Sequence, residues 1–164
     1  SYFAREVLPL VRARVPGARF LIVGRDPVGE VRRLAQLPGV VVTGTVPDVR
    51  PYFADSALAV APFRIARGVQ NKVLEAMASG LPVVGTSLAF QALAATEEDG
   101  VRTADTPERL AEAVVALLLD SGSRREAGRR ARLFVERHHQ WEQLGGRLES
   151  FLASLAPSPR PAVR

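Results

Sequence analysis

Apolar residues follow two alternating patterns along the chain: short unbroken runs, and longer stretches in which they recur every three or four positions. The unbroken runs lie at 19–24, 40–44, 57–61 and 81–86, and each is bordered by glycine or proline. Such runs are typical of strands buried on both faces of a parallel sheet. Because helical stretches separate them, the pattern predicts an α/β domain, a parallel sheet with helices on both faces.

Each stretch with helical spacing predicts a helix whose apolar side covers the sheet. In the third of these helices, Val49, Tyr52 and Phe53 are expected to point inward. Thr106 followed by Pro107 is typical of a helix N-terminus. A short last strand is expected at 100–103. The expected helices lie at 1–15, 28–37, 48–55, 69–79, 88–95 and 106–120, followed by an arginine-rich helix after Ser121-Gly122 and a last helix at 141–155.

Length and composition favour one domain over two. With 164 residues, of which 47% are hydrophobic, the chain can bury one full core. We expect the domain to span residues 1–156, because alternating prolines from Pro157 onward predict a disordered tail at 157–164. The lack of cysteine excludes disulfides and thiolate metal sites. No apolar run approaches the roughly 20 residues that cross a bilayer and no signal peptide precedes Ser1, so a cytoplasmic location is expected.

The net charge of +5 suits phosphate-bearing ligands, anionic lipid surfaces or nucleic acid, and does not choose among them. The arginine-rich helix lacks interleaved aromatic residues, so it does not resemble a nucleic-acid reader. We expect either a solvated helix face or a peripheral contact with membrane headgroups or a neighbouring domain. Much of the positive charge lies in this helix, at Arg124, Arg125, Arg129, Arg130, Arg132 and Arg137.

Other titratable clusters do not predict a catalytic or metal site. His138 and His139 are adjacent, and adjacent residues on a helix point about 100° apart, so they do not form a ligand pair. The acidic run Glu97-Glu98-Asp99 precedes Gly100 and fits a solvated turn.

The segment from Gly68 to Thr86 organises the rest of the chain. Its pattern predicts a loop, a helix with an apolar stripe at Val69, Val73 and Met77, a turn at Gly80, and a buried strand. Such a helix begins at the carboxyl end of the preceding strand, where free backbone N–H groups and the helix dipole attract phosphate.

Lys72 and Glu75 are three residues apart and share one face near the start of that helix. An ammonium group there can contact phosphate oxygens, and a carboxylate can accept hydrogen bonds from ribose hydroxyls. Lys72 is the only lysine in a chain with 22 Lys and Arg residues. A tight phosphate pocket favours its compact charge over a guanidinium, although a lysine on a solvated face is the alternative.

The start of the chain departs from the usual order of a doubly wound domain, which opens on a strand in the middle of its sheet. Here the first expected element is a helix. In the order 3-2-1-4-5-6, the missing first strand would lie between 20–24 and 58–61. The sheet must therefore close that position, borrow a strand from another chain, for example in a homodimer, or remain open.

Several of these motifs resemble those of the retaining GT-B glycosyltransferases (glycosyl transferases group 1 type), which use nucleotide-sugar donors. The resemblance is to their C-terminal donor-binding domain and covers most of residues 2–152. It implies a Rossmann-like C-terminal half of a GT-B fold, with the first strand apparently missing. The matching segments are Pro62-Phe63-Arg64, Gly68 to Thr86, Phe20 to Gly24, Val42 to Asp48, residues 52–62, and Trp141 before the last helix.

The resemblance also implies roles for single residues. The backbone amides of Gly68 and Val69 would lie over the diphosphate, and Lys72 would face the phosphates. Glu75 would match the glutamate that binds the ribose. The residues beside the base would be Thr45 and Val46.

One position departs from the family pattern. Arg67 stands where many members carry a first glutamate, so the role proposed for that carboxylate at the sugar cannot be transferred, and no catalytic residue is named. Arg64 and Arg67 either bind phosphate or are loop arginines in water.

The resemblance implies a donor domain that binds a nucleoside-diphosphate sugar and needs no other cofactor or metal. Catalysis would need an N-terminal domain that these residues do not include, so the chain alone is expected to be inactive. The acceptor would be a glycan or lipid, as in polysaccharide biosynthesis. The alternatives are a non-catalytic nucleotide-sugar-binding module or an epimerase-like half of the same architecture. A receiver-like domain is disfavoured because no acidic cluster ends the first strand.

Overall fold

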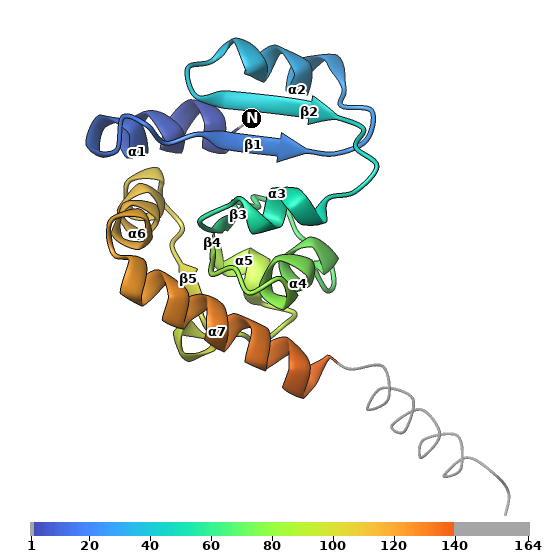
Figure 1. The fold of residues 1–164 in the computed structure, drawn as a ribbon, viewed down its shortest axis with the longest axis vertical. Helices are drawn as coiled ribbons and strands as arrows, with labels where there is room; N and C mark the ends of the chain where they lie inside the picture. Colours follow the sequence, from blue (N-terminus) through green and yellow to red (C-terminus); the bar gives the residue numbers. More distant parts are fainter. Residues whose placement is uncertain (1, 140–164) are drawn as a thin grey trace, which may run out of the picture.

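Parallel strands alternate with helices throughout residues 2–139, the part of the chain that this computed structural model describes (Figure 1). The strands form two sheets, one in the order β1-β2 and the other in the order β3-β4-β5, and every paired strand is parallel to its neighbour. The expected α/β class and parallel pairing are therefore confirmed. The strands are β1 (Phe20–Val23), β2 (Val40–Gly44), β3 (Ala59–Ala61), β4 (Val83–Gly85) and β5 (Val101–Thr103).

Most helices lie close to where the apolar spacing predicted them, but the helix expected at 88–95 ends at Phe90 and the arginine-rich helix already begins at Ser121. The first expected helix begins as a π-helix, η1, and continues as α1. The expected N-terminus at Thr106 is confirmed, because its side-chain oxygen accepts a hydrogen bond from Arg109 N at 3.3 Å. The helices are η1 (Phe3–Val7), α1 (Leu8–Arg14), α2 (Gly29–Arg33), η2 (Leu34–Gln36), α3 (Arg50–Ala54), α4 (Asn71–Ala78), α5 (Ser87–Phe90), η3 (Glu97–Asp99), α6 (Pro107–Leu119) and α7 (Ser121–His138).

The helices cover the strands from two sides. One apolar cluster joins η1, α1 and α6 to both sheets, with buried members that include Phe3, Val7 and Leu110. The other joins α4, α5 and α7 to the β3-β4-β5 sheet and includes Met77 and Phe134. Each cluster lies between helices and sheet, which is the layered arrangement that the alternating pattern predicts.

The sheets remain separate at the position where the sequence lacks a strand. β1 and β3 form the inner edges of the two sheets, and within residues 2–139 no strand lies between them (Figure 1). Of the three outcomes considered above, these residues show an open position.

Three expectations about burial were wrong. Val69 lies before α4 and is 48% exposed, so the buried side of that helix consists of Val73, Ala76 and Met77. Val49 precedes α3 and is 41% exposed. The first three strands are not buried on both faces: β1 is half-buried throughout, Val41 of β2 is exposed, and Ala59 and Val60 of β3 are half-buried. An open edge explains β1, because no strand among the described residues covers its inner side.

The last part of the sequence lies outside the described residues. This applies to Trp141, to the helix expected at 141–155 and to the tail expected at 157–164. The domain boundary at residue 156 therefore stays a prediction.

Candidate functional site

The segment 62–70 leaves the end of β3 and leads into α4. Gly68 has a φ of +63°, in the left-handed region that glycine adopts without strain. The Gln70 side chain closes the turn, because its Nε2 donates to the carbonyl oxygens of Arg67 at 3.2 Å and Gly68 at 3.1 Å. The loop is thus held in a defined shape, with its side chains at Arg67 and Val69 exposed.

The first turn of α4 presents free backbone donors. Gln70 is its N-cap residue and makes no side-chain cap hydrogen bond. Its carbonyl oxygen accepts from Val73 N at 2.9 Å and Leu74 N at 3.3 Å, but within residues 2–139 the N–H groups of Asn71 and Lys72 have no protein acceptor. Unpaired N–H groups at the positive end of a helix dipole favour an anion such as phosphate.

Lys72 and Glu75 lie on the exposed side of α4, whereas Val73, Ala76 and Met77 are buried on the other. No ion pair joins Lys72 to Glu75 in the described part of the chain. An ammonium and a carboxylate on adjacent turns, both accessible, can therefore contact a ligand that lies against the start of the helix.

Thr86 anchors the loop 62–70 through a hydrogen bond. The sequence analysis did not identify this residue. It follows β4 and is 5% exposed, and its hydroxyl donates to the carbonyl oxygen of Phe63 at 2.6 Å. Phe63 N also donates to Ala61 O at 2.9 Å. The sequence contains one indication of this role, because a threonine stands at the end of a buried strand. A buried hydroxyl there needs a hydrogen-bond partner.

Arg64 connects the loop to the first helix. Its guanidinium carbon lies 5.8 Å from the centre of the Tyr2 ring, within the range of a cation–π contact. Burial and then the neighbouring Glu6 raise the pKa of Tyr2, while Arg64 acts to lower it. Arg64 and Arg67 are both exposed, and Arg64 has this aromatic contact in addition to water.

A pocket of about 270 Å³ lies at the carboxyl ends of β1 and β2. Of the two residues expected beside the base, Thr45 lines this pocket and Val46 is half-buried next to it in the sequence without lining it. Asp26 and Arg32, which the sequence analysis did not select, also contribute to the wall, together with Pro27, Ala35, Val42, Thr43 and Gly44. In the sequence, Asp26 could have been selected because it lies two residues after the strand expected at 19–24.

The turn after β2 contains an ion pair between Asp48 and Arg50. Asp48 Oδ1 accepts hydrogen bonds from Arg50 N at 2.9 Å and from Arg50 Nε at 3.0 Å. The hydrogen bond from the Arg50 side chain is the main cause that lowers the pKa of Asp48. The pair lies just after Thr45 and Val46 in the sequence, and both of its side chains are exposed.

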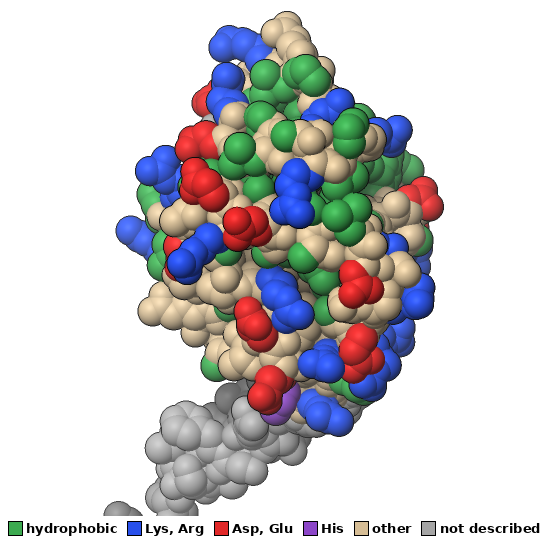
Figure 2. All heavy atoms as spheres, turned by 90° about the vertical axis from the view of Figure 1, so that its left-hand side faces the viewer, with side chains coloured by type: hydrophobic (Ala, Val, Ile, Leu, Met, Phe, Trp, Pro, Cys, Tyr) green, Lys and Arg blue, Asp and Glu red, His purple; other side chains and the backbone are tan. Residues whose placement is uncertain are grey.

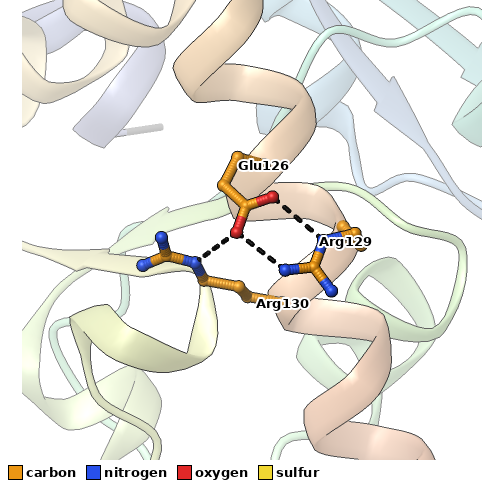
Figure 3. Close-up of polar contacts among 3 residues, drawn as sticks. All are labelled: Glu126, Arg129 and Arg130. Carbon is orange, nitrogen blue, oxygen red and sulfur yellow. Dashed lines mark hydrogen bonds and ion pairs between the residues drawn. The ribbon is translucent and has the colours of Figure 1, made fainter.

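Most arginine side chains of helix α7 form hydrogen bonds, either with acidic residues of the same helix or with carbonyl groups of α6. Glu126 binds Arg129 and Arg130, with distances of 2.8 to 2.9 Å (Figure 3), and Glu136 binds Arg132 at 2.8 Å. Arg124 donates to the last carbonyl groups of α6. On the face shown in Figure 2, acidic and basic side chains are interspersed. This arrangement fits the solvated face that was one of the two expectations.

Two structural features are absent from residues 2–139. These residues contain no group of three or more His, Cys, Asp or Glu side chains arranged to hold a metal ion. None of their helices combines the length and apolar character that a bilayer crossing requires.

His138 and His139 both lie against the ring of Phe134, at centroid distances of 5.0 and 5.5 Å.

The comparison with protein families decides which group the chain is part of. The model of the family described as "Glycosyl transferases group 1" matches residues 1–120, well over half of the sequence. The chain belongs to the group 1 glycosyltransferases. The expected family is therefore confirmed.

Relatives of this group 1 glycosyltransferase chain agree with that assignment. It is 34% identical over 162 residues to the GDP-mannose-dependent alpha-(1-6)-phosphatidylinositol monomannoside mannosyltransferase of Mycobacterium tuberculosis, covering 88% of this chain and 42% of the relative. The chain thus spans less than half the length of this curated relative.

Solved structures share the fold. Sucrose-phosphate synthase from Thermosynechococcus elongatus superposes with a TM-score of 0.72 at 22% identity, over 91% of this chain and 42% of that one. Anabaena HepE in complex with UDP and glucose superposes with a TM-score of 0.75 at 16% identity, over 94% and 46%. The group 1 glycosyltransferase chain therefore corresponds in fold to a part of each of these longer proteins.

Proposed function

We propose that residues 1–164 form the donor-binding part of a glycosyltransferase that moves a sugar from a nucleoside diphosphate to a glycan or lipid acceptor. The observation that carries the proposal is the first turn of α4, where the N–H groups of Asn71 and Lys72, unpaired within residues 2–139, lie next to the accessible ammonium of Lys72. The diphosphate lies against this turn and the backbone of Gly68 and Val69. Family membership and the UDP complex of a structural neighbour support this placement.

The remaining groups are assigned by chemistry. The Glu75 carboxylate accepts hydrogen bonds from the ribose hydroxyls, one helical turn from the phosphates. Thr45 and Val46 lie beside the base, at the pocket that Thr45 lines. Arg64 and Arg67 add positive charge where the site binds the phosphates, since both are exposed on the loop before α4. The donor itself is the substrate, and no further cofactor is needed in this proposal.

In this proposal the residues bind and orient the donor, and transfer needs a second domain. The chain spans 42% of the length of the mannosyltransferase relative. The proposal therefore places the acceptor side and the catalytic cleft in a longer protein that contains these 164 residues, called the parent protein below. We expect weak binding of nucleoside diphosphates by the 164 residues alone and no sugar transfer. The parent protein is expected to act in the cytoplasm, at a membrane surface if its acceptor is a lipid.

Calorimetric titration of the parent protein with UDP, GDP and ADP tests the site. Lys72→Ala and Glu75→Ala should each weaken the Kd of the preferred diphosphate by about tenfold to a hundredfold, because a hydrogen bond to a charged group contributes about 1.5–3 kcal/mol. Arg125→Ala is the matched control, since Arg125 is an exposed cation on α7 and is not among the residues assigned to the donor site. Tight binding that neither site variant changes would refute the assignment.

A non-catalytic binding module is the second candidate, and Arg67 is the observation that favours it. By the family resemblance described above, a guanidinium occupies the place where many members would carry a carboxylate at the sugar. Sugar transfer by the parent protein, measured with a radiolabelled donor, separates the two: binding with transfer supports the enzyme, and binding without transfer to any acceptor supports the module.

A further inference from the structure

The pocket at the carboxyl ends of β1 and β2 is lined by two residues of opposite charge. Asp26 lies in the turn after β1, and Arg32 lies on α2. Both are exposed, and within residues 2–139 neither forms an ion pair with the other or with any third residue. The pocket therefore offers a ligand a hydrogen-bond acceptor and a donor that do not neutralise each other.

Local contacts hold these two residues at the same turn. Arg32 Nε donates to the carbonyl oxygen of Pro27 at 2.8 Å. Because Pro27 directly follows Asp26, this bond ties the guanidinium to the turn that carries the carboxylate, and it does not use the other four N–H donors of the guanidinium. Asp26 has a φ of +42°, in the left-handed region that aspartate adopts more often than most residues.

The rest of the wall suits a flat ring. Pro27, Ala35 and Val42 contribute apolar surface, and Thr45 contributes a hydroxyl group. Apolar surface with a few polar groups is the usual composition of a small-molecule site. The faces of a heterocycle can contact the apolar part of this wall, while its edges form hydrogen bonds with the polar part.

Nucleobases differ in the groups along their edges. Guanine presents two adjacent donors, N1–H and its 2-amino group, followed by the acceptors O6 and N7. A carboxylate can accept from both donors, and a guanidinium can donate to both acceptors. Uracil places its single N3–H between two carbonyl oxygens, which repel a carboxylate. Adenine places its amino group beside an unprotonated nitrogen, which also repels a carboxylate.

We propose that this pocket selects guanine, so that the donor is a sugar linked to guanosine diphosphate. Asp26 accepts from N1–H and the 2-amino group, and Arg32 donates to O6 and N7. The inference rests on the proposed function, because it needs a nucleoside diphosphate at the start of α4. Asp26 and Arg32 are then specificity-determining residues, separate from the groups that bind the phosphates and the ribose.

Calorimetric titration of the parent protein with GDP, UDP, ADP and inosine diphosphate tests this assignment. Inosine diphosphate is GDP without the 2-amino group, so it keeps O6 and N7 and loses one donor. GDP should bind at least about tenfold more tightly than each of the other three, because each of them loses a hydrogen bond to a charged group.

Substitutions separate the two contacts. Asp26→Asn removes the charge and keeps a residue that tolerates the left-handed region. It should weaken GDP binding by about tenfold to a hundredfold, and GDP and inosine diphosphate should then bind almost equally. Arg32→Gln should weaken both equally, since both carry O6 and N7. Asp55→Asn is the matched control and should change no affinity, because Asp55 is an exposed aspartate that follows α3 and does not line the pocket.

The outcomes distinguish this inference from the proposed function. Binding of none of the four diphosphates would refute both. UDP or ADP binding as tight as that of GDP would refute the guanine assignment alone, and so would GDP binding that Asp26→Asn leaves unchanged. Equal affinities of the original protein for GDP and inosine diphosphate would also refute it, and that comparison does not depend on the folding of any variant.

Discussion

At the scale of single residues, a glycine allows a close contact between two elements. A Cβ atom placed on Gly128 of α7 would overlap the carbonyl oxygen of Gly80, in the turn after α4, and would also touch Pro82. The backbone of α7 therefore lies directly against the turn that follows the proposed phosphate-binding helix.

Gly128→Ala should lower the free energy of unfolding by about 1–3 kcal/mol or more, because the overlap is with backbone and the helix must shift. Urea denaturation followed by circular dichroism measures this. Gly17→Ala is the control, since a Cβ there meets nothing within 4 Å. Equal stability of the two variants would show that α7 packs less closely than the structure has it.

Several residues show what the sequence could and could not predict. The face of α4 with Lys72 and Glu75 follows from helical spacing alone. Val69 and Val49 have the right spacing and were still assigned wrongly, because periodicity does not show whether a residue just before a helix is part of it. Thr86 depends on a hydrogen bond to Phe63, 23 residues away, and no local pattern contains that information.

At the scale of elements, the loop 62–70 depends on Thr86. Thr86→Val keeps the shape of the side chain but leaves the Phe63 carbonyl without its donor, which costs about 1–3 kcal/mol. We expect faster trypsin cleavage after Arg64 and Arg67, because the loop loses an anchor. Thr86→Ser retains the hydroxyl and should be cut at the original rate. If Thr86→Val is cut no faster, the hydrogen bond does not hold the loop.

Helix α7 has a pH-dependent contribution from Glu126. Hydrogen bonds from Arg129 and then Arg130 lower the pKa of Glu126 from 4.5 to about 2. A carboxyl group with a lowered pKa in the folded state stabilises the protein above pH 4.5, and this contribution is lost as the pH falls from there towards about 2.

The stability difference between the original protein and Glu126→Gln should therefore be constant above about pH 5.5 and shrink on acidification. Urea unfolding at a series of pH values measures it. The effect is small and decreases with salt, because the three side chains are exposed. Glu112→Gln is the control, since Glu112 makes no ion pair within residues 2–139. A difference that does not change with pH would show that the pairs are not formed in solution.

The elements themselves were largely predictable. Short apolar runs and helical spacing gave the strands and helices to within a few residues, since these patterns reflect burial against a sheet. The sequence did not give the cap of α7, where Asp120 accepts from Gly122 N at 2.8 Å and Ser123 N at 3.0 Å. It also gave the wrong burial for β1. The burial of this strand depends on whether another strand lies beside it, and the apolar run at 19–24 does not contain that information.

At the scale of the whole molecule, the two sheets are held together by η1, α1 and α6. Phe3 is 5% exposed and contacts Phe20, so it connects the first helix to β1. Phe3→Ala should cost on the order of 3–5 kcal/mol, a large share of the 5–15 kcal/mol that is usual for a domain. Leu10→Ala, at a 40% exposed position of the same helical segment, should cost much less. Calorimetric melting compares them, and similar melting temperatures would contradict the connecting role.

The most direct test of the central claim is a map of where a nucleoside diphosphate binds. ¹H–¹⁵N NMR spectra of the chain are recorded with UDP, GDP and ADP up to millimolar concentration. The account predicts that at least one of them shifts the amides of Gly68 to Lys72 most strongly, with smaller shifts at Glu75 and Thr45. Saturable shifts confined to the arginines of α7, or no shifts with any of the three, would contradict it.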